Sequence, residues 1–217
     1  VCCLVDMKTG EKIDFYTSVN TQNIYGSDVI SRINSIMSDI NALKNMQKAL
    51  ISFLNSALDK FEIALSSVRE NIKEVVIAGN TTMLHIAAGV NPSSLAVFPF
   101  TPVFTDCKIL EEDINTELKI NKNCFVKLLP SVSAYIGSDI TAGIEVVKSN
   151  FPDSIKSNIL FVDIGTNGEM ALITKDKITC CSTAAGPAFE GAKITCGTGS
   201  VEGAVSKVAF SDGNIIF

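Results

Sequence analysis

The stretch Ile159-Leu160-Phe161-Val162-Asp163-Ile164-Gly165-Thr166-Asn167-Gly168-Glu169-Met170-Ala171-Leu172-Ile173 gives the clearest indication of the fold. Two apolar runs in it are separated by Asn-Gly. That dipeptide is the strongest short-range signal for a β-hairpin, because both of its residues tolerate a positive φ. The sequence therefore predicts two buried strands joined by a tight turn.

The residues of this turn also suit a phosphate ligand. Gly165 lets the backbone approach a ligand closely, and Thr166 with the amides of Gly165, Asn167 and Gly168 offers donors for phosphate oxygens. Asp163, at the end of the first strand, is a candidate to hold Mg²⁺ through water, since this ion keeps much of its hydration. A plain turn between two strands is the alternative.

Composition indicates a globular protein. The 217 residues are 47% hydrophobic, and the mean hydropathy is +0.31, which gives enough apolar material for a sizeable core. No apolar stretch reaches the length of a bilayer span, and we expect no signal peptide. Val1–Val5 and Ile215–Phe217 both resemble strand interiors, so we expect an excised fragment.

Charge and cysteine content exclude several classes. The net charge of −5 argues against a general nucleic-acid surface, because neutralising phosphates supplies most of that affinity. The seven cysteines form no C-x-x-C pair, and there is one histidine, which argues against zinc or iron–sulfur ligation within this chain. An odd cysteine count without a secretory signal favours a reducing cytoplasm.

Residues 1–150 contain alternating strand and helix signals. Residues 1–20 resemble a hairpin. Residues 27–78 contain neither Gly nor Pro and have a helical pattern of apolar residues, which ends before the apolar strand 74–78. Residues 103–124 are polar and irregular, and 125–129 form the next strand. We expect Val1–Val5 and Glu74–Ala78 to belong to one sheet.

The strand at 74–78 leads into Gly79-Asn80-Thr81-Thr82, which opens a helix. Helix N-termini attract anions, so Asn80 and Thr81 are candidate phosphate contacts, with an ordinary helix N-cap as the alternative. His85 lies one turn further on. We favour a core or capping histidine there over a catalytic one, because no Cys or Ser motif accompanies it.

Three further segments bear on a site. Asp139, in Gly137-Ser138-Asp139, suits a helix N-cap or first turn, or a carboxylate directed into a cleft. The small residues around Gly186 suit a loop beside a ligand, or tight packing. Residues 197–203 resemble a dinucleotide loop, but the third glycine is one place too late and a strand follows, so we reject a Rossmann site; there is no P-loop motif either.

The order of hairpin, helices, strand, helix, strand and helix, followed by a new hairpin, resembles the actin, sugar-kinase and heat-shock-chaperone ATPase superfamily. The resemblance implies an α/β fold with a mixed sheet flanked by helices, truncated at both ends. Residues 1–150 would be a first lobe lacking its first strand and first phosphate turn, and residues 155–217 a partial second lobe beginning with the phosphate hairpin. The segment 151–158, which carries Pro, Asp, Ser and Asn, is the expected boundary.

A closer resemblance, to the C-terminal ATPase-like domain of reductive activators of corrinoid proteins and related ferredoxin-containing proteins, is carried by an ordered set of stretches. They are Tyr25-Gly26-Ser27-Asp28-Val29-Ile30-Ser31-Arg32-Ile33, Ala78–Met83 continuing to Pro99-Phe100-Thr101-Pro102, Leu129–Val132 with Gly137–Gly143, and Asp163–Glu169 with Ala185–Gly191.

The resemblance implies ATP and Mg²⁺ in the full-length protein, with an iron–sulfur cluster in a ferredoxin domain outside this chain. ATP hydrolysis would be coupled to reduction of an inactive cobalt(II) corrinoid to cobalt(I). The implied partner is a corrinoid protein or a corrinoid-dependent methyltransferase in the cytoplasm, with a homodimer left open and neither nucleic acid nor membrane involved. The chain alone should be inactive, because it lacks the first phosphate turn.

Two alternatives stay open at this point. The fold could serve as a regulatory or docking domain without hydrolysis, or as a sugar-kinase-like phosphotransferase. If the chain is an ATPase, we expect Asp163 to position Mg²⁺ and Thr166 with its neighbouring amides to grip phosphate. Asp139 would then orient the attacking water, with a plain helix N-cap as the rival role.

Overall fold

The computed structural model describes residues 1–110, 113–151, 158–165, 167–184, 203–205, 207–211 and 213–216. The chain divides into two compact units, Val1–Pro152 and Asp153–Phe217, and each is described by itself. No helix within the described ranges is long and apolar enough to cross a lipid bilayer.

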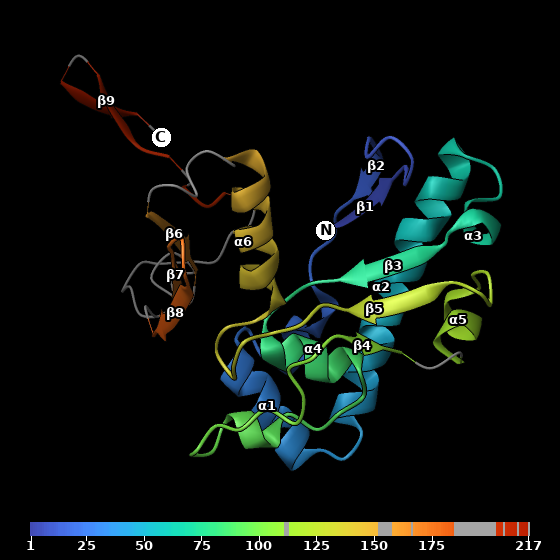
Figure 1. The fold of residues 1–217 in the computed structure, drawn as a ribbon, viewed down its shortest axis with the longest axis horizontal. Coiled ribbons are helices and arrows are strands. Elements are labelled where there is room, and N and C mark those ends of the chain that lie inside the picture. Colours follow the sequence, from blue (N-terminus) through green and yellow to red (C-terminus); the bar gives the residue numbers. More distant parts are fainter. Residues whose placement is uncertain are drawn as a thin grey trace. The chain divides into compact units, whose positions relative to one another are not determined.

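The first unit begins with a hairpin and three α-helices, and it continues with strands that alternate with short helices (Figure 1). Its elements are β1 (Cys2–Val5), β2 (Lys12–Tyr16), the 3₁₀ turn η1 (Thr21–Tyr25), α1 (Val29–Ser38), α2 (Ala42–Ala64), α3 (Val68–Asn71), β3 (Glu74–Ile77), α4 (Thr81–Ala87), η2 (Ser93–Leu95), β4 (Lys108–Ile109), α5 (Asp113–Leu118), β5 (Phe125–Leu128) and α6 (Ser138–Asn150).

Two separate sheets form in the first unit. Antiparallel β1 and β2 make one of them, and the other has the order β3-β5-β4, with β3 parallel and β4 antiparallel to β5. The prediction that 103–124 is irregular was wrong in part, because β4 and α5 form there. Lys108 and Ile109 pair with the end of β5, a contact between distant parts of the chain that no local pattern announces.

The expectation that Val1–Val5 and Glu74–Ala78 share a sheet was also wrong for the described residues. β1 pairs with β2, and β3 pairs with β5. Both nevertheless contribute to one core, since Cys2 and Leu4 from β1 and Val75 from β3 pack against the same buried cluster. Burial of apolar side chains, which requires no backbone pairing, therefore holds these strands on a common helix.

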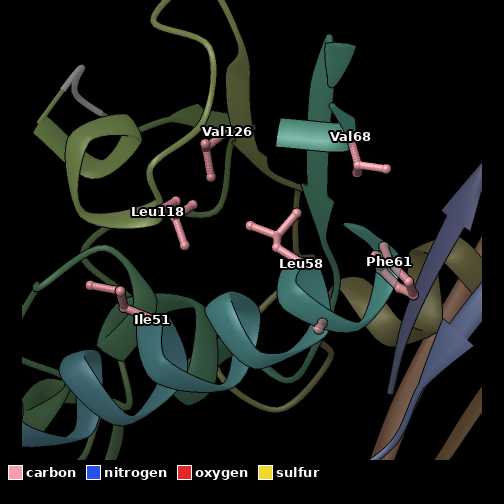
Figure 2. Packing of buried hydrophobic residues seen from close by; sticks show 7 residues of the cluster. Ile51, Leu58, Phe61, Val68, Leu118 and Val126 are labelled. Atoms are coloured by element: carbon pink, nitrogen blue, oxygen red, sulfur yellow. The ribbon is translucent and has the colours of Figure 1, made fainter. Parts of the chain in front are cut away.

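The apolar stripe of α2 forms this core, and its composition explains the long helix. Figure 2 shows Ile51, Leu58 and Phe61 of α2 near Leu118 of α5 and Val126 of β5. All five are buried, and the spacing within α2 places its three side chains on one helical face. The core thus fixes β5, and with it β3, against α2.

The second unit contains a three-stranded antiparallel sheet. Its strands are β6 (Ile159–Ile164), β7 (Gly168–Ile173) and β8 (Ile178–Thr183) in the order β6-β7-β8, and a separate hairpin joins β9 (Ala209–Ser211) to β10 (Asn214–Ile216). The hairpin predicted from the Asn-Gly stretch is confirmed, with Ile159 opposite Ile173 and Ile164 opposite Gly168. Its turn comprises residues 165–167.

Candidate functional site

The junction between β3 and α4 is held by its own polar side chains. Asn80 is the helix N-cap, and its Oδ1 accepts a hydrogen bond from the Met83 amide at 2.9 Å. The Thr81 hydroxyl donates to the Ser133 carbonyl at 2.6 Å, and the Thr81 side chain is buried. Asn80 thus has the N-cap role that the sequence left open, while any phosphate contact of Asn80 or Thr81 stays a prediction.

The start of α6 is joined to this junction by hydrogen bonds. The Ser138 amide donates to the Gly79 carbonyl at 2.9 Å, and the buried Ser138 Oγ accepts from the Gly79 amide at 3.0 Å. Gly137 lies directly on the same backbone, because a Cβ there would come within 2.4 Å of Asn80 Cα and 2.6 Å of the Gly79 oxygen. Only glycine permits this approach.

Asp139 lies in the first turn of α6, one residue after Ser138. The rival role of a plain N-cap was wrong, because Gly137 occupies that position. Its Oδ1 accepts from the neighbouring Ile140 amide at 3.0 Å, and a carboxylate in a first turn is stabilised by the helix dipole. The Asp139 side chain is exposed, so its position at the helix start permits contact with a ligand.

A large groove in the first unit reaches this junction. It has a volume of about 1550 Å³, and its lining includes β1, β3, the apolar face of α2, and several polar residues, among them Asn80, Asp139 and Gln22. The groove therefore extends from β1 and β3 to Asn80 and Asp139, two of the candidate residues that the sequence selected.

In the second unit, the turn between β6 and β7 carries the predicted phosphate residues. The Gly165 amide donates to the Asn167 carbonyl at 2.9 Å, which closes the turn. Asp163 is exposed and lies directly opposite Glu169 in the strand register. The Ser182 hydroxyl of β8 reaches Glu169 Oε1 at 3.5 Å. Two carboxylates thus face each other beside the turn, an arrangement that is unfavourable without a compensating charge.

Gly168 differs from the expectation for Asn-Gly. It is the first residue of β7, where it pairs with Ile164 and Thr183, and its φ is not positive. Its glycine is instead explained by packing, because an added Cβ would lie 3.2 Å from the Thr183 methyl group. The turn is consequently one residue earlier than the local pattern indicated.

The candidate residues fall into two groups. Asn80, Thr81 and Asp139 come together in the first unit, while Asp163, Gly165, Asn167 and Gly168 surround one turn in the second. Thr166 and Gly186 lie outside the described residues. Sequence reasoning did not single out Ser138, which joins the start of α6 to Gly79. It also did not single out Glu169, whose position opposite Asp163 follows from the hairpin register.

His85 has a structural role. It is fully buried, its Nδ1 lies 2.8 Å from the Thr81 carbonyl, and its Nε2 accepts from the Val103 amide at 3.0 Å. These partners require the neutral ring with its proton on Nδ1, and burial lowers its pKa below the ordinary 6.5. The ring also stacks on Phe104 at 4.4 Å. His85 is therefore a core histidine, as the sequence predicted.

The stretch Tyr25–Ile33, which carries part of the resemblance, fixes the start of α1 through side-chain hydrogen bonds. Asp28 and Ser31 make a capping box at the start of α1. Arg32 is buried, and its guanidinium donates to the Gly26 carbonyl at 3.0 Å and to Asn23 Oδ1 at 2.8 Å. Gly26 has φ of 148°, and a Cβ there would collide with Ser31. This motif positions α1.

The described residues contain no group of three or more His, Cys, Asp or Glu side chains arranged to hold a metal. The cysteines among them are free thiols at positions 2, 3, 107, 124, 180 and 181. These thiols do not fit an iron–sulfur cluster, which requires about four gathered ligands. The Asp163–Glu169 pair does fit Mg²⁺, which proteins often bind through one or two carboxylates plus phosphate oxygens.

Comparison with known proteins places this geometry in a family. A model described as the RACo middle region matches residues 1–150, and one described as the C-terminal domain of RACo, the ASKHA domain, matches residues 157–216. The ASKHA match agrees with the α/β fold expected from the sequence. A solved structure named "Reductive activator for corrinoid, iron-sulfur protein" matches with a TM-score of 0.79 at 34% identity, over 99% of this chain and 34% of that one.

Two curated relatives point in the same direction. The corrinoid activation enzyme RamQ of Eubacterium limosum is 32% identical over 214 residues, which is 99% of this chain and 35% of the relative. A Co(II) methylated amine-specific corrinoid protein reductase of Methanosarcina barkeri is 28% identical over 137 residues, which is 63% of this chain and 23% of the relative. The chain spans at most about a third of the length of these proteins. It belongs to the RACo family, with its first 150 residues in the middle region and residues 157–216 in the C-terminal ASKHA domain.

Proposed function

We propose that this chain is the ATP-hydrolysing part of a longer cytoplasmic protein that reductively activates corrinoid proteins. In this proposal, ATP hydrolysis is coupled to reduction of a cobalt(II) corrinoid on a partner protein to cobalt(I). Support comes from membership of the RACo family and from relatives named as corrinoid activation enzymes or reductases. The substrate cobalt belongs to the partner protein.

The observation that carries the proposal is the pair of opposed carboxylates at the β6–β7 turn. Asp163 and Glu169 lie in register at the end of two paired strands, where the chain turns through Gly165 and Asn167. A divalent cation there removes the like-charge repulsion of the pair. Mg²⁺, when bound with ATP, neutralises charge on the phosphates and orients them.

Each residue near this turn then has a defined task. Asp163 holds the cation through water, and Glu169 supplies a second negative charge from the adjacent strand. The amides of residues 165–168 and the Thr166 hydroxyl donate to the terminal phosphate oxygens. Gly186 lies outside the described residues, and its proposed part, close approach of the backbone to the nucleotide, rests on its residue type alone. These donors stabilise negative charge as it develops on the transferred group.

In the first unit, Asp139 is proposed to orient the attacking water. Its support is its exposed position in the first turn of α6, where Ser138 and Gly137 fix the helix start against Gly79. Asn80 caps α4 and Thr81 bonds the Ser133 carbonyl, so their side-chain oxygens already have partners in the fold. Any phosphate contact from Asn80 would come from its side-chain NH₂ group, because its Oδ1 already caps α4.

A second candidate is a regulatory domain that binds nucleotide without hydrolysing it. The commitment of Asn80 and Thr81 to internal hydrogen bonds favours it, because it leaves fewer polar groups for catalysis in the first unit. Asp139 separates the two functions, since a water-orienting carboxylate is needed only for hydrolysis.

The test uses the full-length protein with ATP, Mg²⁺ and a corrinoid protein as substrate. Asp163→Asn should lower ATP turnover about 100-fold, comparable to removing one preorganised group from a transition state. Formation of cobalt(I), followed by its absorbance, should fall in parallel. Asp176→Asn is the matched control, because Asp176 is an exposed aspartate of the same unit between β7 and β8. Wild-type turnover in Asp163→Asn would remove the turn from the site.

A further inference from the structure

Two loops of the first unit present a row of aromatic rings at the surface. Phe98 and Phe100 belong to the loop between η2 and β4, and Tyr135 belongs to the loop between β5 and α6. The ring centroids of Phe98 and Phe100 are 6.0 Å apart, those of Phe100 and Tyr135 are 5.7 Å apart, and both pairs meet edge to face. Phe98 is 82% exposed, so burial within this unit does not account for the row.

Exposed valines of the same two loops extend the row. The Val97 carbonyl accepts a hydrogen bond from the Phe100 amide at 2.7 Å, and Val132 belongs to the loop of Tyr135; both valines are exposed. We call the five residues Val97, Phe98, Phe100, Val132 and Tyr135 the aromatic surface. Single exposed apolar residues need no explanation, whereas exposed apolar side chains gathered together mark interaction sites.

The backbone at Phe100 shows that its ring is held in place at an energetic cost. Its φ is 58°, in the left-handed region, where a residue with a Cβ is unfavourable and glycine is the ordinary choice. The neighbouring ring is fixed as well, because the Tyr135 hydroxyl donates to the Leu95 carbonyl at 3.0 Å. Strained residues of this kind concentrate at functional sites, and glycine at position 100 would remove the strain together with the ring.

Neither loop carries a charged side chain along this surface. Residues 75–105 and 128–138 contain no Asp, Glu, Lys or Arg, although these types make up 19% of the chain. Depletion of charge together with enrichment in Phe and Tyr is the composition found at the core of protein–protein interfaces. The matching face of a partner is therefore apolar, because a buried charge on it would meet no opposite charge on these loops.

The loop that carries Tyr135 is bonded to the start of α4 and runs into the start of α6. The Ser133 carbonyl of this loop accepts a hydrogen bond from the buried Thr81 hydroxyl at 2.6 Å. The loop ends at Gly137, the N-cap of α6, which lies against the backbone of Asn80. A partner seated on the aromatic surface thus contacts the loop that leads directly into the helix start carrying Asp139.

We propose that the aromatic surface is the docking site for the corrinoid protein, which binds there through an uncharged apolar face. The identity of this partner rests on the proposed function. The surface suits a partner that binds and leaves, because a stable interface takes about 20–30 residues a side, whereas a few aromatic residues dominate the energy of a contact. The loop from Tyr135 to Asp139 then connects docking to the proposed water-orienting carboxylate, as coupling of activation to hydrolysis requires.

Calorimetric binding of the full-length protein to a cobalt(II) corrinoid protein tests this assignment. Phe98→Ser should raise Kd about tenfold or more, the cost of truncating an aromatic residue at the centre of an interface. Ile63→Ser is the matched control, because Ile63 is a large apolar residue of the same unit that is 89% exposed and lies on α2, outside both loops. Its Kd should equal that of the wild type. Val132→Ser, on the second loop, should also raise Kd, and it decides the test if Phe98→Ser fails to fold.

ATP turnover without the partner should be unchanged in Phe98→Ser, because Phe98 is not among the residues proposed to bind nucleotide. A wild-type Kd in both Phe98→Ser and Val132→Ser would overturn this inference and leave the proposed function standing, whereas a wild-type protein that binds no corrinoid protein would overturn both. Unchanged Kd with a lower Tm in Phe98→Ser would assign the surface to another segment of the same polypeptide. Unchanged Kd with loss of a dimer, measured by sedimentation, would assign it to a second copy. Either of these results would also overturn the inference.

Discussion

The β3–α4–α6 junction and the β6–β7 turn hold the candidate residues in contrasting ways. At the junction, the polar groups of Asn80, Thr81 and Ser138 are bonded within the fold, and Gly137 permits backbone contact closer than any other residue would. At the turn, Asp163 is exposed and lies opposite a second carboxylate. In the first region the polar groups are used in hydrogen bonds within the fold, and in the second a charged side chain is exposed to solvent.

This difference indicates a division of labour. A rigid junction stabilises the fold and holds the start of α6, which carries Asp139, whereas an open acidic turn gains most from a bound cation. Substitutions at the junction should therefore change stability first, with Asp139 as the exception. Substitutions at the turn should change activity and leave the fold intact.

The largest effect that would sharpen the comparison is expected from Asp139→Asn in the full-length protein. If Asp139 orients water, ATP turnover should fall by about two orders of magnitude, as for loss of a positioned base. Stability should be retained, because asparagine has nearly the same shape and the site is exposed. Glu145→Gln, on the exposed face of the same helix, is the control. Unchanged turnover would exclude Asp139 from the site and leave Asp163 as the carboxylate to explain.

Gly137→Ala should produce the next largest effect, this time on folding. The added methyl group would overlap Asn80 Cα at 2.4 Å, and overpacking of this kind lowers the free energy of unfolding by about 1–3 kcal/mol. Chemical denaturation measures the loss. Gly79→Ala is the control, because its Cβ meets only Met83 Cβ at 3.7 Å. Equal stability of the two variants would mean that the junction is not rigid.

Asn80→Ala should destabilise the chain by about 1 kcal/mol, because it removes the side-chain acceptor that caps α4. Asn80→Asp keeps an acceptor and should retain stability, which thermal unfolding can measure. If both variants lose nucleotide affinity while only Asn80→Ala loses stability, Asn80 also contacts the ligand. If affinity follows stability, its role is the cap alone.

The smallest effect concerns pH and His85. Burial lowers the pKa of His85 in the folded state, so the unfolded chain binds more protons as pH falls. The contribution of the neutral ring to stability is therefore complete above about pH 6.5 and is lost progressively below it. Denaturation between about pH 8 and pH 5 measures this loss, and His85→Gln should flatten the profile. His85 is the one histidine, so a persistent slope in that variant would contradict the assignment.

Much of the fold could be predicted because its signals are local. The Asn-Gly hairpin, the apolar stripe of α2, the helix start at Asn80 and the strand at Phe125–Leu128 each follow from residues close together in the sequence. Pairings between distant segments were missed. The β4–β5 pair is two residues long, and no periodicity can reveal a strand so short.

The candidate site divides in the same way. Sequence alone selected Asp139, Asp163 and the glycines near them, because carboxylates and glycine at strand and helix ends are recognisable by type and spacing. Only the tertiary structure showed that Gly137 lies against the backbone of Gly79 and that the Thr81 hydroxyl is hydrogen-bonded to the Ser133 carbonyl. Contacts of this kind depend on which segments the core brings together, and a sequence pattern describes one segment at a time.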